Sequence, residues 1–117
     1  MTLSLRRGEL YRIESLGGDT KRYRVVVVVS REPFLERGYS TAICAPVYSS
    51  FEGLGTEVSL GPTTGLKRES SIRCDELRSV LRSTLTNYVG SLSGAEIDSL
   101  DRALAVALGI DHLFWPR

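Results

Sequence analysis

The sequence is poor in the residues that build metal centres and disulfide frameworks. Its 117 residues include one histidine and two cysteines, Cys44 and Cys74. The cysteines stand in separate apolar segments and form no Cys-x-x-Cys pair, and a single histidine does not complete a zinc set with them. We therefore expect no metal and no cofactor. A disulfide is left open by the sequence, but buried free thiols in a reducing cytoplasm are the simpler interpretation.

Net charge and long apolar segments are also scarce. The net charge of +1 is too small for non-specific duplex binding by bulk charge. The five valines at Val25–Val29 are far too few to span a membrane, and no apolar leader core follows Arg6 and Arg7. We expect a cytoplasmic protein with no membrane contact. The cations are unevenly spread and gather in the first third of the chain: Arg6, Arg7, Arg12, Lys21, Arg22, Arg24 and Arg31.

What the chain does contain is a series of short β-branched segments between glycine and proline turns. Its length suits one domain over residues 1–117, with 42% apolar and 25% charged residues. Val25–Val29 predicts a strand buried on both faces, and Pro46 predicts a strand edge or end. Arg31–Ser40 is expected as a polar loop and Gly61–Gly65 as a turn. Strands are expected at Leu3–Leu16, Tyr23–Ser30, Thr41–Tyr48, Thr56–Leu60, Ser71–Val80 and Asn87–Leu92, with one helical turn at Leu81–Leu85.

The end of the chain changes from strand to helix periodicity. Ser93 and Glu96 have capping-box spacing, and apolar residues then recur at helical intervals. This predicts a helix over Gly94–Leu108 that stops at Gly109. The expected fold is mainly β (α+β), a small twisted barrel with a C-terminal helix. The apolar tail Ile110–Arg117 is expected to pack on its own domain or on a partner.

A charged pair stands out within Ser71–Val80. On a strand, Arg73 and Asp75 would share one face, while Cys74 would point to the core. A fixed cation beside a fixed carboxylate could handle a phosphate and a proton. The same pair also fits an ordinary surface ion pair, and the residues alone leave both readings open.

Six motifs in order span most of the chain, from about Leu5 to Gly109. They are Arg7–Tyr11, Arg24 with Val25–Ser30, Thr41–Val47, Gly65–Ser70, Arg73–Arg78 and Val89–Ser93. Together they resemble the MazF/PemK family of toxin–antitoxin ribonucleases. The resemblance implies a compact SH3-like barrel of the MazF/CcdB type and a homodimer. It also implies sequence-specific, metal-independent cleavage of single-stranded RNA, chiefly mRNA, and a cognate antitoxin as partner.

The resemblance also implies site residues. Arg24, Arg73 and Asp75 match positions that act in catalysis in the family. The hydroxyl at the end of the third strand falls on Tyr48, with Ser49 next to it, so both are candidate catalytic hydroxyls. The remaining expected RNA contacts are Lys21, Arg22 and Ser50. The chain departs from the family at Val25, where a proline is usual, and in a first loop shortened to Leu16–Lys21 without a histidine.

The chemistry of metal-independent RNA cleavage explains why such residues are needed. The ribose 2′-OH is the nucleophile, so the site requires a base, cations for the phosphorane charge and a proton for the leaving oxygen. Asp75 is the only candidate base in the motif, although an ordinary carboxyl pKa near ~4 makes it a weak one. Arg24 and Arg73 suit the phosphate, because a guanidinium matches phosphate oxygens bidentately.

Two other functions fit the same fold. One is a gyrase poison of the CcdB type that acts on DNA-bound topoisomerase through an aromatic C-terminus, here Phe114 and Trp115. The other is a barrel that binds nucleic acid or protein without catalysis. His112 lies outside every matched motif and receives no catalytic role.

Overall fold

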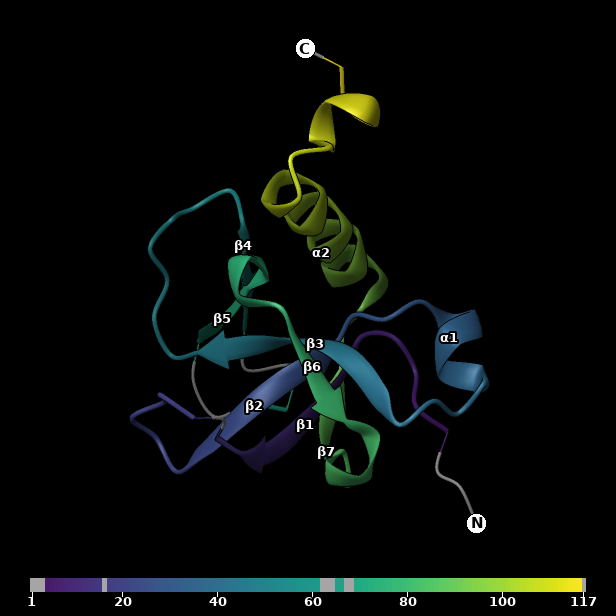
Figure 1. Cartoon of the computed structure of the whole chain (residues 1–117). Coiled ribbons are helices and arrows are strands. Elements are labelled where there is room, and N and C mark those ends of the chain that lie inside the picture. The colour runs from purple at the N-terminus through teal and green to yellow at the C-terminus, as the bar shows by residue number, and fades with distance from the viewer. Residues whose placement is uncertain (1–3, 16, 62–64, 67–68, 117) are drawn as a thin grey trace.

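A computed structural model of the chain describes residues 4–15, 17–61, 65–66 and 69–116. Seven strands form one antiparallel half-barrel sheet in the order β4-β5-β3-β2-β1-β7, and β6 pairs with β3 outside this path (Figure 1). The strands are β1 (Glu9–Glu14), β2 (Tyr23–Val28), β3 (Thr41–Tyr48), β4 (Glu57–Leu60), β5 (Ser70–Arg73), β6 (Arg78–Leu81) and β7 (Asn87–Ser91). The helices are α1 (Glu32–Glu36) and α2 (Gly94–Ala107), with 3-10 turns at Cys74–Glu76, Arg82–Thr84 and Asp111–Leu113.

The valine segment forms the centre of the sheet, as predicted. β2 lies between β1 and β3, and its side chains alternate between two buried clusters. Val26 and Val28 belong to one cluster, and Val27 belongs to the other, which also contains Leu100 and Ala103 of α2. Both faces of β2 are therefore buried, which explains why five consecutive β-branched residues are stable there.

Pro46 does not mark an edge or an end, so that expectation is wrong. β3 pairs with β6 through Thr41–Cys44 and with β5 through Val47–Tyr48, and Pro46 lies between the two ladders. The amide of Val29 donates to the carbonyl of Ile43 at 2.9 Å. Hydrogen-bonded and non-hydrogen-bonded residue pairs alternate along an antiparallel ladder. Because Ile43 is in a hydrogen-bonded pair with Val29, directly after β2, Pro46, three residues further along β3, is in a non-hydrogen-bonded pair. Its nitrogen therefore points away from β2. The proline thus occupies the position where a missing N–H removes no ladder bond.

The predicted strand Ser71–Val80 is interrupted, and this expectation is wrong in part. The chain leaves β5 at Arg73, makes the 3-10 turn Cys74–Glu76 and resumes as β6. The turn takes up a change of register. Continued from Val47–Ile72, the ladder would pair Cys44 with Asp75, but Cys44 pairs with Arg78, so three residues are left over for the turn. Cys74 is buried on the core side, as predicted, but Arg73 and Asp75 do not share a strand face.

The C-terminal helix begins and ends as its sequence predicts. The hydroxyl of Ser93 accepts the N–H of Glu96, and the Glu96 side chain accepts the N–H of Ser93. Gly109 follows the helix with a φ of 74°, a conformation that favours glycine at a helix end. Two side chains of α2, Leu100 and Ala103, are buried in the cluster that covers one face of the sheet, and Ala105 is buried beside the C-terminal tail.

Three smaller expectations have mixed outcomes. The first strand begins only at Glu9, after a kink at Gly8 where φ is 90°. The predicted loop Arg31–Ser40 contains α1, which Pro33 helps to start and the buried Leu35 anchors. The predicted turn at Leu81–Leu85 is confirmed as the 3-10 turn Arg82–Thr84. Outside the described residues lie Leu3, Leu16, most of the turn Gly61–Gly65 and two residues of the motif Gly65–Ser70.

The two cysteines and the tail complete the fold. Cys44 and Cys74 are buried free thiols, as predicted, and lie in different core clusters. In the tail, the ring of Trp115 lies 4.7 Å from the guanidinium carbon of Arg102. Phe114 remains 62% exposed, so the tail packs on its own domain only in part. No helix in the described part of the chain has the length and apolarity needed to cross a membrane.

Candidate active site

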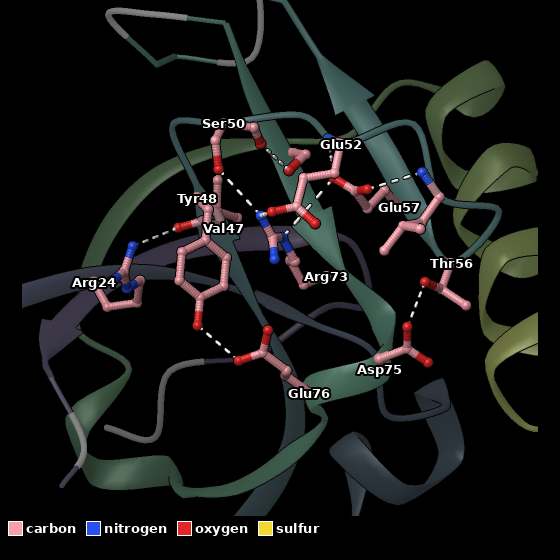
Figure 2. A network of polar contacts seen from close by, with 12 residues as sticks. Arg24, Val47, Tyr48, Ser50, Glu52, Thr56, Glu57, Arg73, Asp75 and Glu76 are labelled. Carbon is pink, nitrogen blue, oxygen red and sulfur yellow. Dashed lines mark hydrogen bonds and ion pairs between the residues drawn. The ribbon is translucent and has the colours of Figure 1, made fainter. Parts of the chain in front are cut away.

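Tyr48 lies between two arginines where three strands end. Its ring centre is 4.1 Å from the guanidinium carbon of Arg24 and 4.8 Å from that of Arg73 (Figure 2). The sheet register produces this arrangement, since β2, β3 and β5 run side by side at these residues. Each guanidinium is attracted to the ring's π system, so the aromatic side chain keeps two cations close together despite their repulsion.

Arg24 is held by the turn that connects β1 and β2. Its Nε donates to Oδ2 of Asp19 at 2.8 Å, and its Nη2 donates to Oδ1 at 2.7 Å. A third, longer bond runs from Nη1 to the carbonyl of Val47 at 3.3 Å. The hydrogen bonds from Arg24 hold the pKa of Asp19 well below its ordinary value, and Asp19 in turn raises the pKa of Arg24. Arg24 is only 9% exposed, so its charge is fixed in place.

Arg73 is held from the opposite side by the loop between β3 and β4. Its Nη2 donates to the Ser50 hydroxyl at 3.1 Å and lies 3.5 Å from a carboxylate oxygen of Glu52. Its Nε lies 3.8 Å from Oε2 of Glu57 and has no hydrogen-bond partner among the described residues. The guanidinium of Arg73 is therefore held mainly by its attraction to the carboxylates of Glu52 and Glu57, and its Nε–H makes no hydrogen bond with the described residues.

Glu57 is the buried part of this anchor. Its side chain has no exposed area, and it accepts the backbone N–H of Leu54 at 2.9 Å and of Glu52 at 3.1 Å. These backbone hydrogen bonds lower the pKa of Glu57 despite its burial, and Arg73 lowers it further. Glu57 therefore remains ionised and links the loop conformation to the position of Arg73.

The Tyr48 hydroxyl donates to Oε1 of Glu76 at 2.7 Å. Burial raises the pKa of Tyr48, and the hydrogen bond to Glu76 raises it further, so the phenol keeps its proton at neutral pH. Glu76 and Tyr48 line a cavity of about 280 Å³ together with Asp19, Arg24 and Arg78. The cavity thus places two carboxylates, a phenol and two guanidinium groups around one space.

Asp75 lies apart from this group. Its Oδ2 accepts the Thr56 hydroxyl at 2.5 Å, and in Figure 2 it turns away from Tyr48. Within the described part of the chain it makes no ion pair with Arg73, whose carboxylate partners are Glu52 and Glu57. The 3-10 turn explains the separation, because it directs Asp75 and Glu76 to different sides.

The other predicted residues surround the site. Ser50 contacts Arg73, and Ser49 is exposed beside it at the end of β3. Lys21 is exposed and donates its backbone N–H to Asp19, while Arg22 is exposed and its guanidinium carbon lies 5.3 Å from the Tyr23 ring centre. No cluster of three or more His, Cys, Asp or Glu side chains that could hold a metal ion occurs among the described residues.

Sequence reasoning missed three functional candidates: Asp19, Glu57 and Glu76. Asp19 stands in a glycine turn and Glu57 opens a short strand, so neither carried a local signal. Glu76 had one, because it follows Asp75 directly in the acidic pair after Arg73. Only the direction of the turn separates the two carboxylates.

The fold and the site together define a small β half-barrel protein with an arginine–tyrosine cluster suited to a phosphodiester. Residues 6–108 match the sequence profile of the PemK-like, MazF-like toxins of type II toxin–antitoxin systems. The probable endoribonuclease MazF of Mycolicibacterium smegmatis is 32% identical over 108 residues, which cover 91% of this chain and 98% of that protein. The chain therefore belongs to the PemK-like, MazF-like toxin family.

One further relative agrees with this assignment, and a solved structure shares the fold. The probable endoribonuclease MazF5 of Mycobacterium tuberculosis is 34% identical over 86 residues, covering 73% of this chain and 78% of the relative. A solved endoribonuclease from a mycobacterial species, in complex with its cognate antitoxin, matches with a TM-score of 0.79. Its identity is 24%, and the match covers 94% of this chain and 97% of that one. The predicted family and fold are confirmed, and the gyrase-poison and non-catalytic alternatives are not favoured.

Proposed function

We propose that this chain is a sequence-specific endoribonuclease toxin that cleaves single-stranded RNA, chiefly mRNA, through attack of the 2′-OH. The observation that carries the proposal is the Tyr48 ring held between Arg24 and Arg73, with Glu76 at its hydroxyl. The endoribonuclease names of the relatives support the same chemistry. The expected products are a 2′,3′-cyclic phosphate and a 5′-hydroxyl.

The two arginines hold the scissile phosphate. Arg73 acts through its positive charge, since its Nε is buried beside Glu57. Arg24 has one donor engaged only through the longer bond to Val47. A phosphate in the cavity competes with Asp19 for Arg24, since both present oxygens to the same guanidinium face. Negative charge that develops on the phosphorane is then met by Arg24 at the cavity wall, and Arg73 adds its positive charge from its place at the Tyr48 ring.

Glu76 is the carboxylate that the geometry favours as proton acceptor. It lines the cavity and is exposed, whereas Asp75 is bonded to Thr56 outside it. In the proposed step Glu76 takes the 2′-OH proton, the oxygen forms a bond to phosphorus, and the bond to the 5′ oxygen breaks. Water protonates the departing 5′ oxygen. Once Glu76 has taken the 2′-OH proton, the Tyr48 phenol turns its single O–H from Glu76 to the phosphate.

We assign the other residues predicted from the sequence to secondary roles around Tyr48 and the two arginines. Asp75 is the second carboxylate to test as a base, and Ser49 is the second hydroxyl. Ser50 contacts RNA through its position beside Arg73. Lys21 contacts phosphates from the turn that contains Asp19, and Arg22 contacts them beside Tyr23. No metal or other cofactor takes part in the proposed reaction.

The proposal extends to the setting of the protein. Residues 1–117 form a single toxin domain that acts in the cytoplasm as a homodimer. A cognate antitoxin neutralises it, as supported by the mycobacterial endoribonuclease solved with its own antitoxin. Exposed apolar side chains such as Phe114 and Leu113 suit contacts with a second chain.

The test is cleavage of a long single-stranded RNA by the purified protein in EDTA. We expect discrete cuts with cyclic-phosphate ends, and a rate loss of roughly 10²–10³ in Arg73→Ala. Glu76→Gln and Asp75→Asn are compared side by side, because each removes one carboxylate charge with little change of shape. Arg37→Ala, at the end of α1, is the matched control and should keep the wild-type rate.

The outcomes separate the parts of the proposal. A large loss in Glu76→Gln with near wild-type activity in Asp75→Asn supports Glu76 as the base. The reverse result assigns that role to Asp75, as the sequence predicts. RNA that remains intact with the folded wild-type protein contradicts the endoribonuclease proposal.

A further inference from the structure

A second groove lies next to the cavity at Tyr48. It has a volume of about 480 Å³ and is lined by Arg12, Tyr23 and Asn87, among others. Ile13 and Val80 line both this groove and the cavity that contains Arg24. The two spaces are therefore neighbours, separated by the buried side chains of Ile13 and Val80.

The groove contains an exposed aromatic ring with cations over it. Tyr23, the first residue of β2, is 44% exposed. The guanidinium carbon of Arg12 lies 5.2 Å from its ring centre, and that of Arg22 lies 5.3 Å from it. The register places Glu14 opposite Tyr23 and Arg12 two residues along the same exposed face of β1. The sheet thus fixes Arg12 beside the ring.

An exposed aromatic ring beside guanidinium groups is an arrangement with which proteins bind single-stranded nucleic acid. Bases stack on exposed aromatic rings, and neighbouring guanidinium groups hold the phosphates. Beside the ring, positive charge exceeds negative charge, because Arg12 and Arg22 flank it and Glu14 is the only acidic side chain among the described residues that line the groove. The adjoining cavity is balanced, because two arginines and two carboxylates line it: Arg24, Arg78, Asp19 and Glu76.

We propose that RNA leaving the Tyr48 site crosses the wall at Ile13 and Val80, stacks a base on Tyr23 and places the next phosphate on Arg12. This inference rests on the proposed function, because it extends the same RNA strand beyond the cleavage site. Tyr23 and Arg12 then form a stacking subsite that increases affinity for longer RNA without touching the reacting atoms. The subsite acts on binding and not on the chemical step.

The test measures binding of RNA whose 2′-hydroxyls are all methylated, so that the nucleophile is blocked. Two lengths of about four and about twelve nucleotides are compared by fluorescence anisotropy. In Tyr23→Ala we expect roughly tenfold weaker binding of the long RNA and unchanged binding of the short one. Tyr23→Phe retains the ring and should bind like wild type. Arg37→Gln, an exposed arginine on α1, is the cation control.

Arg12→Gln gives an independent readout. Loss of one phosphate contact should reduce the slope of log affinity against log salt by about 0.7 for the long RNA only. The slope should not change in Arg37→Gln. Circular dichroism and thermal unfolding of each variant show whether it is folded.

Failure of this inference differs from failure of the proposed function. If Tyr23→Ala and Arg12→Gln bind long RNA as tightly as wild type, the subsite is overturned even where cleavage is normal. If the groove binds a protein segment and not RNA, the two variants also bind long RNA as tightly as wild type, and the subsite is overturned. If length-dependent binding is lost in both variants while wild-type protein cuts no RNA, the subsite holds and the endoribonuclease proposal fails.

Discussion

At the residue scale, carboxylates outside the predicted motifs determine where the two arginines point. Asp19 binds two nitrogens of Arg24, and Glu57 faces the Nε of Arg73 from a fully buried position. Glu52 also approaches Arg73, but its side chain is 60% exposed. Since solvent weakens exposed ion pairs far more than buried ones, Glu57 matters more than Glu52 for the position of Arg73.

We therefore expect Glu57→Gln to lower kcat by about ten- to a hundredfold, because a cation displaced by about 1 Å loses much of its effect. Glu52→Gln is the matched control and should change kcat little. Single-turnover RNA cleavage measures both variants, and urea unfolding shows how much stability each loses. Equal rates for the two variants would mean that the buried carboxylate does not position Arg73.

At the element scale, the interruption between β5 and β6 and the cap of α2 have the largest consequences. The 3-10 turn Cys74–Glu76 lets two short strands pair with one long strand, β3, and it turns Glu76 toward the cavity. The capping box of Ser93 and Glu96 fixes the start of α2, which covers one face of the sheet. Local hydrogen bonds therefore position both elements.

Ser93→Ala should lower the free energy of unfolding by about 1 kcal/mol, because the N–H of Glu96 loses its side-chain acceptor. Ser99→Ala, on the exposed surface of the same helix, should leave stability unchanged or raise it slightly through helix propensity. Urea unfolding followed by circular dichroism compares the two. A loss in Ser99→Ala as large as that in Ser93→Ala would argue against a specific role for the cap.

At the scale of the whole molecule, the sheet separates two hydrophobic clusters. Cys44 and Tyr11 lie in one, and Cys74 lies in the other, beneath α2. Burial raises the pKa of both thiols to about 12, and burial together with Glu9 raises the pKa of Tyr11 to about 12. All three groups therefore remain protonated in the folded protein at pH values where they ionise after unfolding.

Stability should therefore fall as pH rises. The unfolded thiols lose protons from about pH 8.5 and the unfolded phenol from about pH 10, whereas the folded groups keep theirs to about pH 12. Each group contributes at most about 1.4 kcal/mol per pH unit within its window. Urea unfolding between pH 7 and pH 10.5 measures the slope.

Tyr11→Phe provides the control for the phenol and should flatten the decline only above about pH 10. Labelling of the thiols in the native protein should be slow and should accelerate in urea, since both sulfurs are buried. Rapid labelling of either cysteine under native conditions would contradict the burial on which the pH dependence rests.

Several parts of this protein could be predicted from the sequence because their causes are local. Five valines can be stable only with both faces of the strand buried, so β2 had to be central. Ser93 and Glu96 define a helix start through bonds within four residues. The six motifs in order were enough to identify the family over residues 6–108. Arg24 and Arg73 followed from that resemblance.

Only the tertiary structure decided which groups meet those arginines. Tyr48 lies between them because β2, β3 and β5 pair in one register, which depends on residues far apart in the chain. Asp75 and Glu76 are adjacent in the sequence, but the alternation of side chains that linked Asp75 to Arg73 holds only for a continuous strand. The register against β3 shifts between β5 and β6 and interrupts that strand, and the resulting turn places Glu76 against Tyr48 and Asp75 against Thr56.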